Sequence, residues 1–205
     1  MPEKRKSVII GLTGGPGTGK SLAAKFLRNK GAVVLSGDEA GKRAVETRSV
    51  RDKLVKAFGR EILKRDGGLD RRKLGRIVFG DPDELEKLND IVHPGLLRIL
   101  KADLEEQKRK RVRLVVIDAA LIFEWMIANW CDYILVVTAR RDIRMERLIK
   151  SGLTRKEAID RINSQIPDRD KAALADYVIE NNGTKAEFRR KVDEFVNLII
   201  VGAFN

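Results

Sequence analysis

Four residues of a short glycine-rich segment have the types and spacing to bind a nucleoside triphosphate. Gly14, Gly19, Lys20 and Ser21 fit the pattern G-x-x-x-x-G-K-[ST]. In this pattern the loop amides point at phosphate oxygens, the lysine reaches the β- and γ-phosphates, and the serine hydroxyl binds Mg²⁺. A dinucleotide-binding loop is the main alternative, but such a loop does not call for a lysine at this position.

The residues around this loop predict the elements that would position it. Residues 7–13 form a β-branched apolar run, typical of a buried parallel strand. Residues 20–30 carry apolar side chains at helical spacing, and residues 32–35 form a second short strand. The loop is therefore expected between a strand and the N-terminus of a helix, whose dipole favours anions.

Further strands are expected at residues 114–117, 133–137 and 177–179. Helices are expected at residues 49–58, 70–79, 82–92, 94–110, 142–150, 154–165 and 184–201, with a break at His93-Pro94. Strands that alternate with helices predict an α/β fold with a five-stranded parallel sheet flanked by helices. We expect one domain whose core is residues 1–39, 112–139 and 173–205. Residues 40–111 would form a helical insertion and residues 140–172 a lid.

Acidic residues follow two of the expected strands. Asp38 comes after the second strand, Asp118 ends the third, and Glu124 follows six residues later. The carboxyl ends of parallel strands face one crevice, so these groups should lie at the edge that holds the loop. Asp38 could accept the proton of an acceptor hydroxyl or hold a magnesium-bound water, or it could simply cap a helix. Asp118 is placed where a carboxylate near Mg²⁺ is usual.

Arginines gather in the expected lid. Residues 140–171 hold ten Lys/Arg and six Asp/Glu, and Arg144 and Arg147 lie three apart on one helical face. Such side chains could close over phosphates and stabilise the transferring charge. A solvated amphipathic face is the alternative for about half of them.

Composition narrows the classes of function. The chain has 205 residues, a net charge of +12 and 43% hydrophobic residues. The positive charge suits a phosphate-rich substrate, whereas 5% aromatic residues and no aromatic-basic patch argue against nucleic acid. No apolar run reaches the ~20 residues of a membrane helix, and we expect a cytoplasmic protein that does not bind membranes. Cys131 and His93 are the single cysteine and histidine, which argues against a disulfide or zinc site.

Several segments together resemble the dephospho-CoA kinase family. They are GLTGGPGTGKS, SGDEAGKRAV, VHP, DAALIFE, RINSQ and ADYVIENNG, and their order and spacing cover nearly the whole chain. The resemblance implies a phosphate-loop (nucleoside-monophosphate-kinase-like) fold with a helical CoA-binding lobe and a lid. It also implies phosphorylation of the ribose 3′-hydroxyl of dephospho-CoA by ATP and Mg²⁺, the final step of coenzyme A synthesis.

The resemblance also implies roles for individual residues. Asp38 would be the general base, acting with Lys20 and the lid arginine Arg147. The residues implied to bind ATP are Gly14, Gly15, Gly17, Thr18, Gly19, Lys20, Ser21, Leu22, Asn182 and Gly183. Those implied on the acceptor side are Asp38, Arg71, His93, Asp118, Leu121, Glu124 and Arg161. Ser21 would bind Mg²⁺, with Asp38 or Asp118 acting directly or through water.

This chain departs from the family pattern in four places. Ser36 replaces an aspartate before the expected base, Leu22 replaces a threonine after the loop, and Ala120 replaces a proline. A second lid arginine is either Lys150 or absent. A nucleoside or nucleotide monophosphate kinase remains the alternative enzyme, and a nucleotide-gated nucleic-acid-binding module the alternative without catalysis. A monomer or small homo-oligomer is expected.

Overall fold

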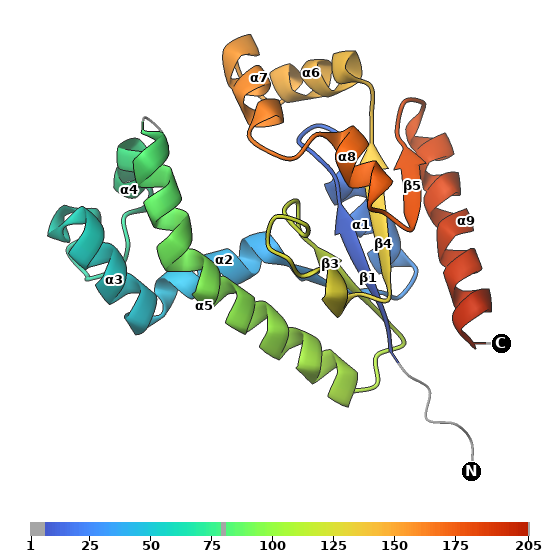
Figure 1. Cartoon of the computed structure of the whole chain (residues 1–205), viewed down its shortest axis with the longest axis horizontal. Helices are drawn as coiled ribbons and strands as arrows, with labels where there is room; N and C mark the ends of the chain where they lie inside the picture. Colours follow the sequence, from blue (N-terminus) through green and yellow to red (C-terminus); the bar gives the residue numbers. More distant parts are fainter. Residues whose placement is uncertain (1–6, 79–80, 205) are drawn as a thin grey trace. The chain divides into compact units, whose positions relative to one another are not determined.

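The computed structural model describes residues 7–78 and 81–204, with side chains described as far as residue 201 (Figure 1). Its five strands form one sheet in the order β2-β3-β1-β4-β5. The strands are β1 (Val8–Thr13), β2 (Val33–Ser36), β3 (Leu114–Asp118), β4 (Tyr133–Thr138) and β5 (Tyr177–Glu180). β1 pairs in parallel with β3 and β4, and β4 pairs in parallel with β5. The predicted α/β fold with a five-stranded parallel sheet is confirmed.

Helices connect these strands. They are α1 (Lys20–Asn29), α2 (Gly37–Glu46), α3 (Arg48–Phe58), α4 (Arg71–Val78), α5 (Pro82–Arg109), α6 (Arg141–Lys150), α7 (Arg155–Asn163), α8 (Asp168–Ala173) and α9 (Lys185–Phe204). Two short 3₁₀ helices, η1 (Arg60–Ile62) and η2 (Ala128–Trp130), complete the described elements. Most predicted elements are present, with boundaries that differ by a few residues. The short helix α8 was not predicted.

The chain divides into two compact units. The first contains Met1–Leu35 and Glu106–Asn205, and the second contains Ser36–Glu105. The sheet core lies in the first unit, where every residue of β1 is buried. Apolar side chains of β1, β3, β4, α1 and α9 pack there in one cluster. This burial on central strands explains why β1 reads as a continuous apolar run rather than an alternating one.

The second unit is helical and has its own core. Val50, Leu54 and Phe58 of α3 pack with Ile62 of η1, and with Leu74 and Val78 of α4. Val50, Leu54 and Phe58 recur at four-residue intervals along α3, which places them on one face of the helix. The unit therefore buries an apolar stripe independently of the sheet.

The expected helix break at His93-Pro94 is wrong. α5 runs without interruption from Pro82 to Arg109, with Pro94 inside it. A proline inside a helix loses one hydrogen bond and costs roughly 3 kcal/mol. Burial on the continuing face offsets this cost, because Gly95, Leu96 and Leu100 are all buried. A Cβ on Gly95 would lie 2.9 Å from Val50 Cγ2, so α5 packs tightly against α3 just after the proline.

Candidate active site

The glycine-rich segment, residues 14–21, forms a loop after β1 and the first two residues of α1, as the pattern predicts. We call it the phosphate loop. Its backbone depends on glycine at two tight positions. A Cβ on Gly14 would lie 2.4 Å from the Val137 carbonyl oxygen, and one on Gly19 would lie 2.2 Å from Asn181 Nδ2. Gly19 also has a φ of 102°, in the left-handed region that favours glycine.

Thr18 fixes the turn of the phosphate loop from within. Its side chain is fully buried, and its Oγ1 donates to the Gly15 carbonyl oxygen at 2.8 Å. The Thr18 amide donates to the same oxygen at 3.3 Å. Two hydrogen bonds to one carbonyl therefore close the loop on itself.

Lys20 begins α1 and forms an ion pair with Asp118 at the end of β3. Leu12 of β1 lies beside Asp118 in the parallel register, which explains how residues 98 positions apart meet. An ammonium group carries three protons, so Lys20 can contact Asp118 and still donate to a phosphate. Ser21 is exposed on the first turn of α1 and so is accessible to a ligand, and Leu22 is half-buried beside it.

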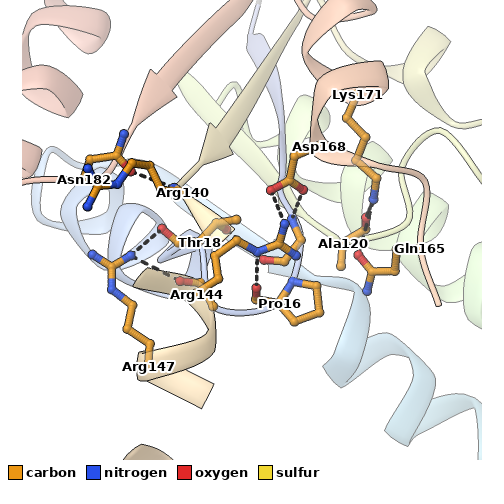
Figure 2. A network of polar contacts seen from close by, with 12 residues as sticks. Pro16, Thr18, Ala120, Arg140, Arg144, Arg147, Gln165, Asp168, Lys171 and Asn182 are labelled. Atoms are coloured by element: carbon orange, nitrogen blue, oxygen red, sulfur yellow. Dashed lines mark hydrogen bonds and ion pairs between the residues drawn. The ribbon is translucent and has the colours of Figure 1, made fainter. Parts of the chain in front are cut away.

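Two helices that follow β4 and α7 reach the phosphate loop through a buried ion pair (Figure 2). Arg144 Nη1 of α6 lies 2.6 Å from Asp168 Oδ2 of α8, and the two side chains are 8% and 14% exposed. Arg144 Nε donates to the Pro16 carbonyl oxygen at 2.8 Å, and Asp168 Oδ1 accepts from the Gly15 amide at 3.2 Å. The pair therefore contacts both a donor and an acceptor of the loop backbone.

Burial affects the titration of both partners. It raises the pKa of the Asp168 carboxyl, against the opposing effects of Arg144, the Gly15 amide and Lys171. It lowers the pKa of the Arg144 guanidinium, which Asp168 partly opposes. A guanidinium still remains charged near neutral pH.

Arg147 lies one turn along α6 and bonds to main-chain carbonyls. Nη1 donates to the Gly17 and Thr18 oxygens at 3.2 Å each, and Figure 2 shows Arg147 beside Thr18. Nη2 donates to the Asn181 oxygen at 2.9 Å. The side chain thus ties the phosphate loop to the segment that follows β5. Arg140, by contrast, is exposed and pairs with Asp142.

The segment after β5 also contacts the phosphate loop. Asn181 is buried, and its Nδ2 donates to the Thr18 carbonyl oxygen at 2.8 Å. Asn182 is exposed, and its Oδ1 accepts from the Arg140 amide at 2.8 Å. Gly183 is exposed next to it, where a capping box made by Thr184 and Glu187 begins α9. Sequence reasoning named Asn182 and Gly183 but missed Asn181, whose contact lies 163 residues away along the chain.

A second buried cation lies on α8. Lys171 is 0% exposed; its Nζ donates to the Ala120 carbonyl oxygen at 2.6 Å and lies 3.0 Å from Glu124 Oε1. The Ala120 oxygen also accepts from Thr13 Oγ1 at 3.0 Å. Lys171 therefore holds the segment that follows Asp118. Sequence reasoning missed this lysine, although a lysine three residues after Asp168 shares its helix face.

The remaining residues expected on the acceptor side of this unit lie apart from those networks. Leu121 is half-buried in the turn after β3, where its carbonyl oxygen accepts from the Trp125 amide at 2.8 Å. Arg161 is exposed on α7. A cavity of about 470 Å³ lies beside the phosphate loop, lined among others by Gly15, Arg144 and Asp168.

Three predicted residues belong to the second unit. Asp38 is exposed in the first turn of α2, where Ser36 Oγ caps the helix by accepting from the Glu39 amide at 3.3 Å. The cap is therefore Ser36 and not Asp38. Arg71 is exposed at the start of α4, pairs with Glu46 at 2.9 Å, and lines a cavity of about 570 Å³. His93 is half-buried in α5.

Two negative findings apply to the described part of the chain. Among those residues, three or more His, Cys, Asp and Glu side chains do not gather into a group able to hold a metal. No helix there has the length and apolar character needed to span a bilayer.

The parallel sheet, the glycine loop after its central strand and the Lys20–Asp118 pair define a phosphate-loop nucleotide-binding protein. A family model described as dephospho-CoA kinase matches residues 8–187. The chain therefore belongs to the dephospho-CoA kinase family, whose members are phosphotransferases.

Curated relatives agree with this assignment, and a solved structure has a similar fold. A dephospho-CoA kinase of Geobacillus kaustophilus is 41% identical over 188 residues, covering 91% of this chain and 94% of the relative. One of Fusobacterium nucleatum is 38% identical, covering 94% and 98%. A crystal structure from Thermus thermophilus has a TM-score of 0.78 at 34% identity, covering 95% of this chain and 98% of that one.

Proposed function

We propose that the protein transfers the γ-phosphoryl group of ATP to the ribose 3′-hydroxyl of dephospho-CoA, giving coenzyme A and ADP. The family match over residues 8–187 carries this proposal, because it includes the phosphate loop, Asp38 and Asp118. A new bond forms between the 3′-oxygen and the γ-phosphorus while the bond to the leaving ADP oxygen breaks. The hydroxyl proton must go to a base.

The phosphate loop forms the donor side. The loop amides would surround the phosphates of ATP. The residues involved are Gly14, Gly15, Gly17, Thr18 and Gly19, and Leu22 would lie behind them. Lys20 would donate to the β- and γ-phosphates, where its charge stabilises the developing negative charge. Asn182 and Gly183 would lie near the adenine, since both are exposed on the segment that Arg147 and Asn181 tie to the loop.

The residues present fit a magnesium ion. Mg²⁺ in such sites keeps several waters and takes one or two protein oxygens, the rest coming from the phosphates. The Ser21 hydroxyl, which is exposed, would supply one such oxygen, and Asp118 or Asp38 would act through water. When bound, the ion would neutralise phosphate charge during transfer. This requirement is compatible with the lack of a dedicated metal cluster among the described residues.

Asp38 is the proposed general base for the acceptor. Its carboxylate would accept the proton of the 3′-hydroxyl as the oxygen attacks. Because Ser36 already caps α2, the Asp38 carboxylate is not needed for that role. This observation favours the catalytic interpretation over the helix-cap alternative left open by the sequence.

The acceptor-side residues are proposed from the family match. Arg71 and His93 would contact dephospho-CoA from the helical insertion, and Leu121, Glu124 and Arg161 from the sheet unit. Glu124 Oε2 is buried and accepts no hydrogen bond from the described residues. Residues 140–172 would act as the lid, with Arg147 supporting the transferring group.

A direct assay tests the proposal. Purified protein is incubated with MgATP and one acceptor at a time, and ADP formation and the acceptor mass are followed. We expect one phosphate to be added to dephospho-CoA. An analogue that lacks the 3′-hydroxyl should not be phosphorylated. Transfer to nucleoside monophosphates instead would support the alternative kinase. We also propose that the protein lies in the cytoplasm and is a monomer or small homo-oligomer. Gel filtration tests the oligomeric state.

A further inference from the structure

We propose that Arg144 and Asp168 are positioning residues that hold the phosphate loop in its nucleotide-binding conformation. This inference rests on the proposed ATP-dependent function, but it concerns only the donor side. Neither residue has to touch the reacting atoms. They act through the Gly15 amide and the Pro16 carbonyl, to which they are hydrogen-bonded.

The first argument is where the pair contacts the loop. Thr18, Arg147 and Asn181 fix the end of the loop nearest α1. Arg144 and Asp168 are bonded instead to the beginning of the loop, at Gly15 and Pro16. Without the pair, Thr18 Oγ1 would be the one remaining side-chain atom described here that is hydrogen-bonded to the backbone of Gly15 or Pro16.

The second argument is how closely the pair fits the loop. A Cβ on Gly15 would lie 2.6 Å from both Arg144 Nη2 and Asp168 Oδ1. A Cβ on Gly17 would lie 2.8 Å from the main-chain oxygen of Arg144. Protein interiors transmit small displacements because they are closely packed. A shift of α6 or α8 would therefore move the loop amides that the phosphates require.

The third argument is that the pair joins the loop to two other elements. Arg144 lies on α6, at the end of the connection from β4, and Asp168 lies on α8. Lys171, on the same short helix as Asp168, holds the Ala120 carbonyl after β3. α8 therefore links the phosphate loop with the segment that carries Asp118, the partner of Lys20.

A buried ion pair can instead serve stability alone, and the variants must separate the two roles. Arg144→Lys keeps the charge but loses the Nε contact with Pro16, and Asp168→Asn keeps the shape but loses the charge. The double variant Arg144→Met/Asp168→Leu replaces the pair by apolar side chains, which is often neutral or stabilising for a buried pair. Glu146→Gln is the matched control, because it breaks an exposed pair with Lys150 on the same helix.

The measured quantities are the Kd for MgATP without acceptor, the KM for each substrate, kcat and the thermal midpoint. We expect the Kd for MgATP to rise about tenfold in Arg144→Lys, Asp168→Asn and the double variant, with kcat/KM for ATP falling ~10–100-fold. The KM for dephospho-CoA should stay within twofold. Glu146→Gln should match the wild type in every parameter.

Two other outcomes would contradict the proposed positioning role of Arg144 and Asp168. A wild-type Kd for MgATP in the double variant, or in both single variants where the double variant does not fold, would overturn the proposal. Equal losses in the KM of both substrates would also contradict it, since a general structural role predicts that result. If the wild type fails to phosphorylate dephospho-CoA, the proposed function fails, whereas the Kd for MgATP still decides this inference.

Discussion

The charged side chains around the phosphate loop and those of the helical second unit are held in different ways. Arg144 and Lys171 are buried and the Asp168 side chain is only 14% exposed, and each bonds to backbone atoms of the loop or of the segment after β3. In the second unit, Arg71 and Asp38 are exposed, and Arg71 pairs only with exposed groups of α2.

This difference indicates which contacts are already formed before substrates bind. Donors held in a fixed geometry need no reorganisation when they meet phosphate, so preorganisation favours the nucleotide side. An exposed arginine in a surface pair contributes little to stability and can exchange its partner for a substrate anion. The comparison therefore predicts that substitutions in the two regions affect different substrates.

Replacement of the proposed base should produce the largest effect. In Asp38→Ala, we expect kcat to fall ~10²–10⁴-fold, the range for loss of a positioned base, or roughly 3–5 kcal/mol of barrier. The Kd for MgATP should change little, because any contact of Asp38 with the magnesium ion would be through water. Glu39→Ala, at the neighbouring exposed carboxylate, is the control. Wild-type turnover in Asp38→Ala would remove this residue from the mechanism.

Loss of the loop lysine should weaken both binding and transfer. In Lys20→Met, kcat is expected to fall about 10²–10³-fold, comparable to loss of one donor at a developing negative charge, and MgATP should bind more weakly. Single-turnover kinetics and nucleotide titration measure the two effects. Lys25→Met, on the exposed face of α1, should behave as the wild type. Normal kinetics in Lys20→Met would contradict the phosphate assignment.

The free energy of unfolding should respond differently to substitutions beside the phosphate loop and in the second unit. Arg144→Ala leaves Asp168 buried without its partner, and we expect the free energy of unfolding to fall by about 3 kcal/mol. Arg71→Ala removes one side of an exposed pair and should leave the denaturant midpoint almost unchanged. Equal midpoints for the two variants would show that burial does not distinguish these pairs.

The acceptor side should give the smallest of these effects. Arg71→Ala is expected to raise the KM for dephospho-CoA about tenfold, the loss of one charged hydrogen bond, with kcat and the KM for ATP unchanged. Steady-state kinetics with each substrate varied in turn measures this split. Arg48→Ala, an exposed arginine on α3, is the control. An unchanged KM would remove Arg71 from the acceptor site.

Local sequence patterns predicted the elements that position the loop. The apolar run of β1 and the glycine spacing each involve residues within a few positions of each other, and the strand and the loop are both present. The exception is Pro94, where a local rule predicted a break but burial of the α5 face prevailed.

The contacts around the loop could not be predicted in this way. Asp168 meets Gly15 across 153 positions, and it lies in a charge-rich segment with no clear periodicity. Arg144 was recognised as part of an arginine cluster, but nothing in the sequence indicates that it is buried while Arg140 is exposed. Such pairings depend on how α6 and α8 pack, which the sequence pattern alone does not reveal.

A kinetic comparison of Arg144→Lys and Arg71→Ala tests most directly the claim that the nucleotide side is preorganised and the acceptor side is not. The two measured quantities are the Kd for MgATP and the KM for dephospho-CoA. We predict that Arg144→Lys weakens only MgATP binding and that Arg71→Ala raises only the KM for dephospho-CoA. The account would be contradicted if both variants changed the same parameter.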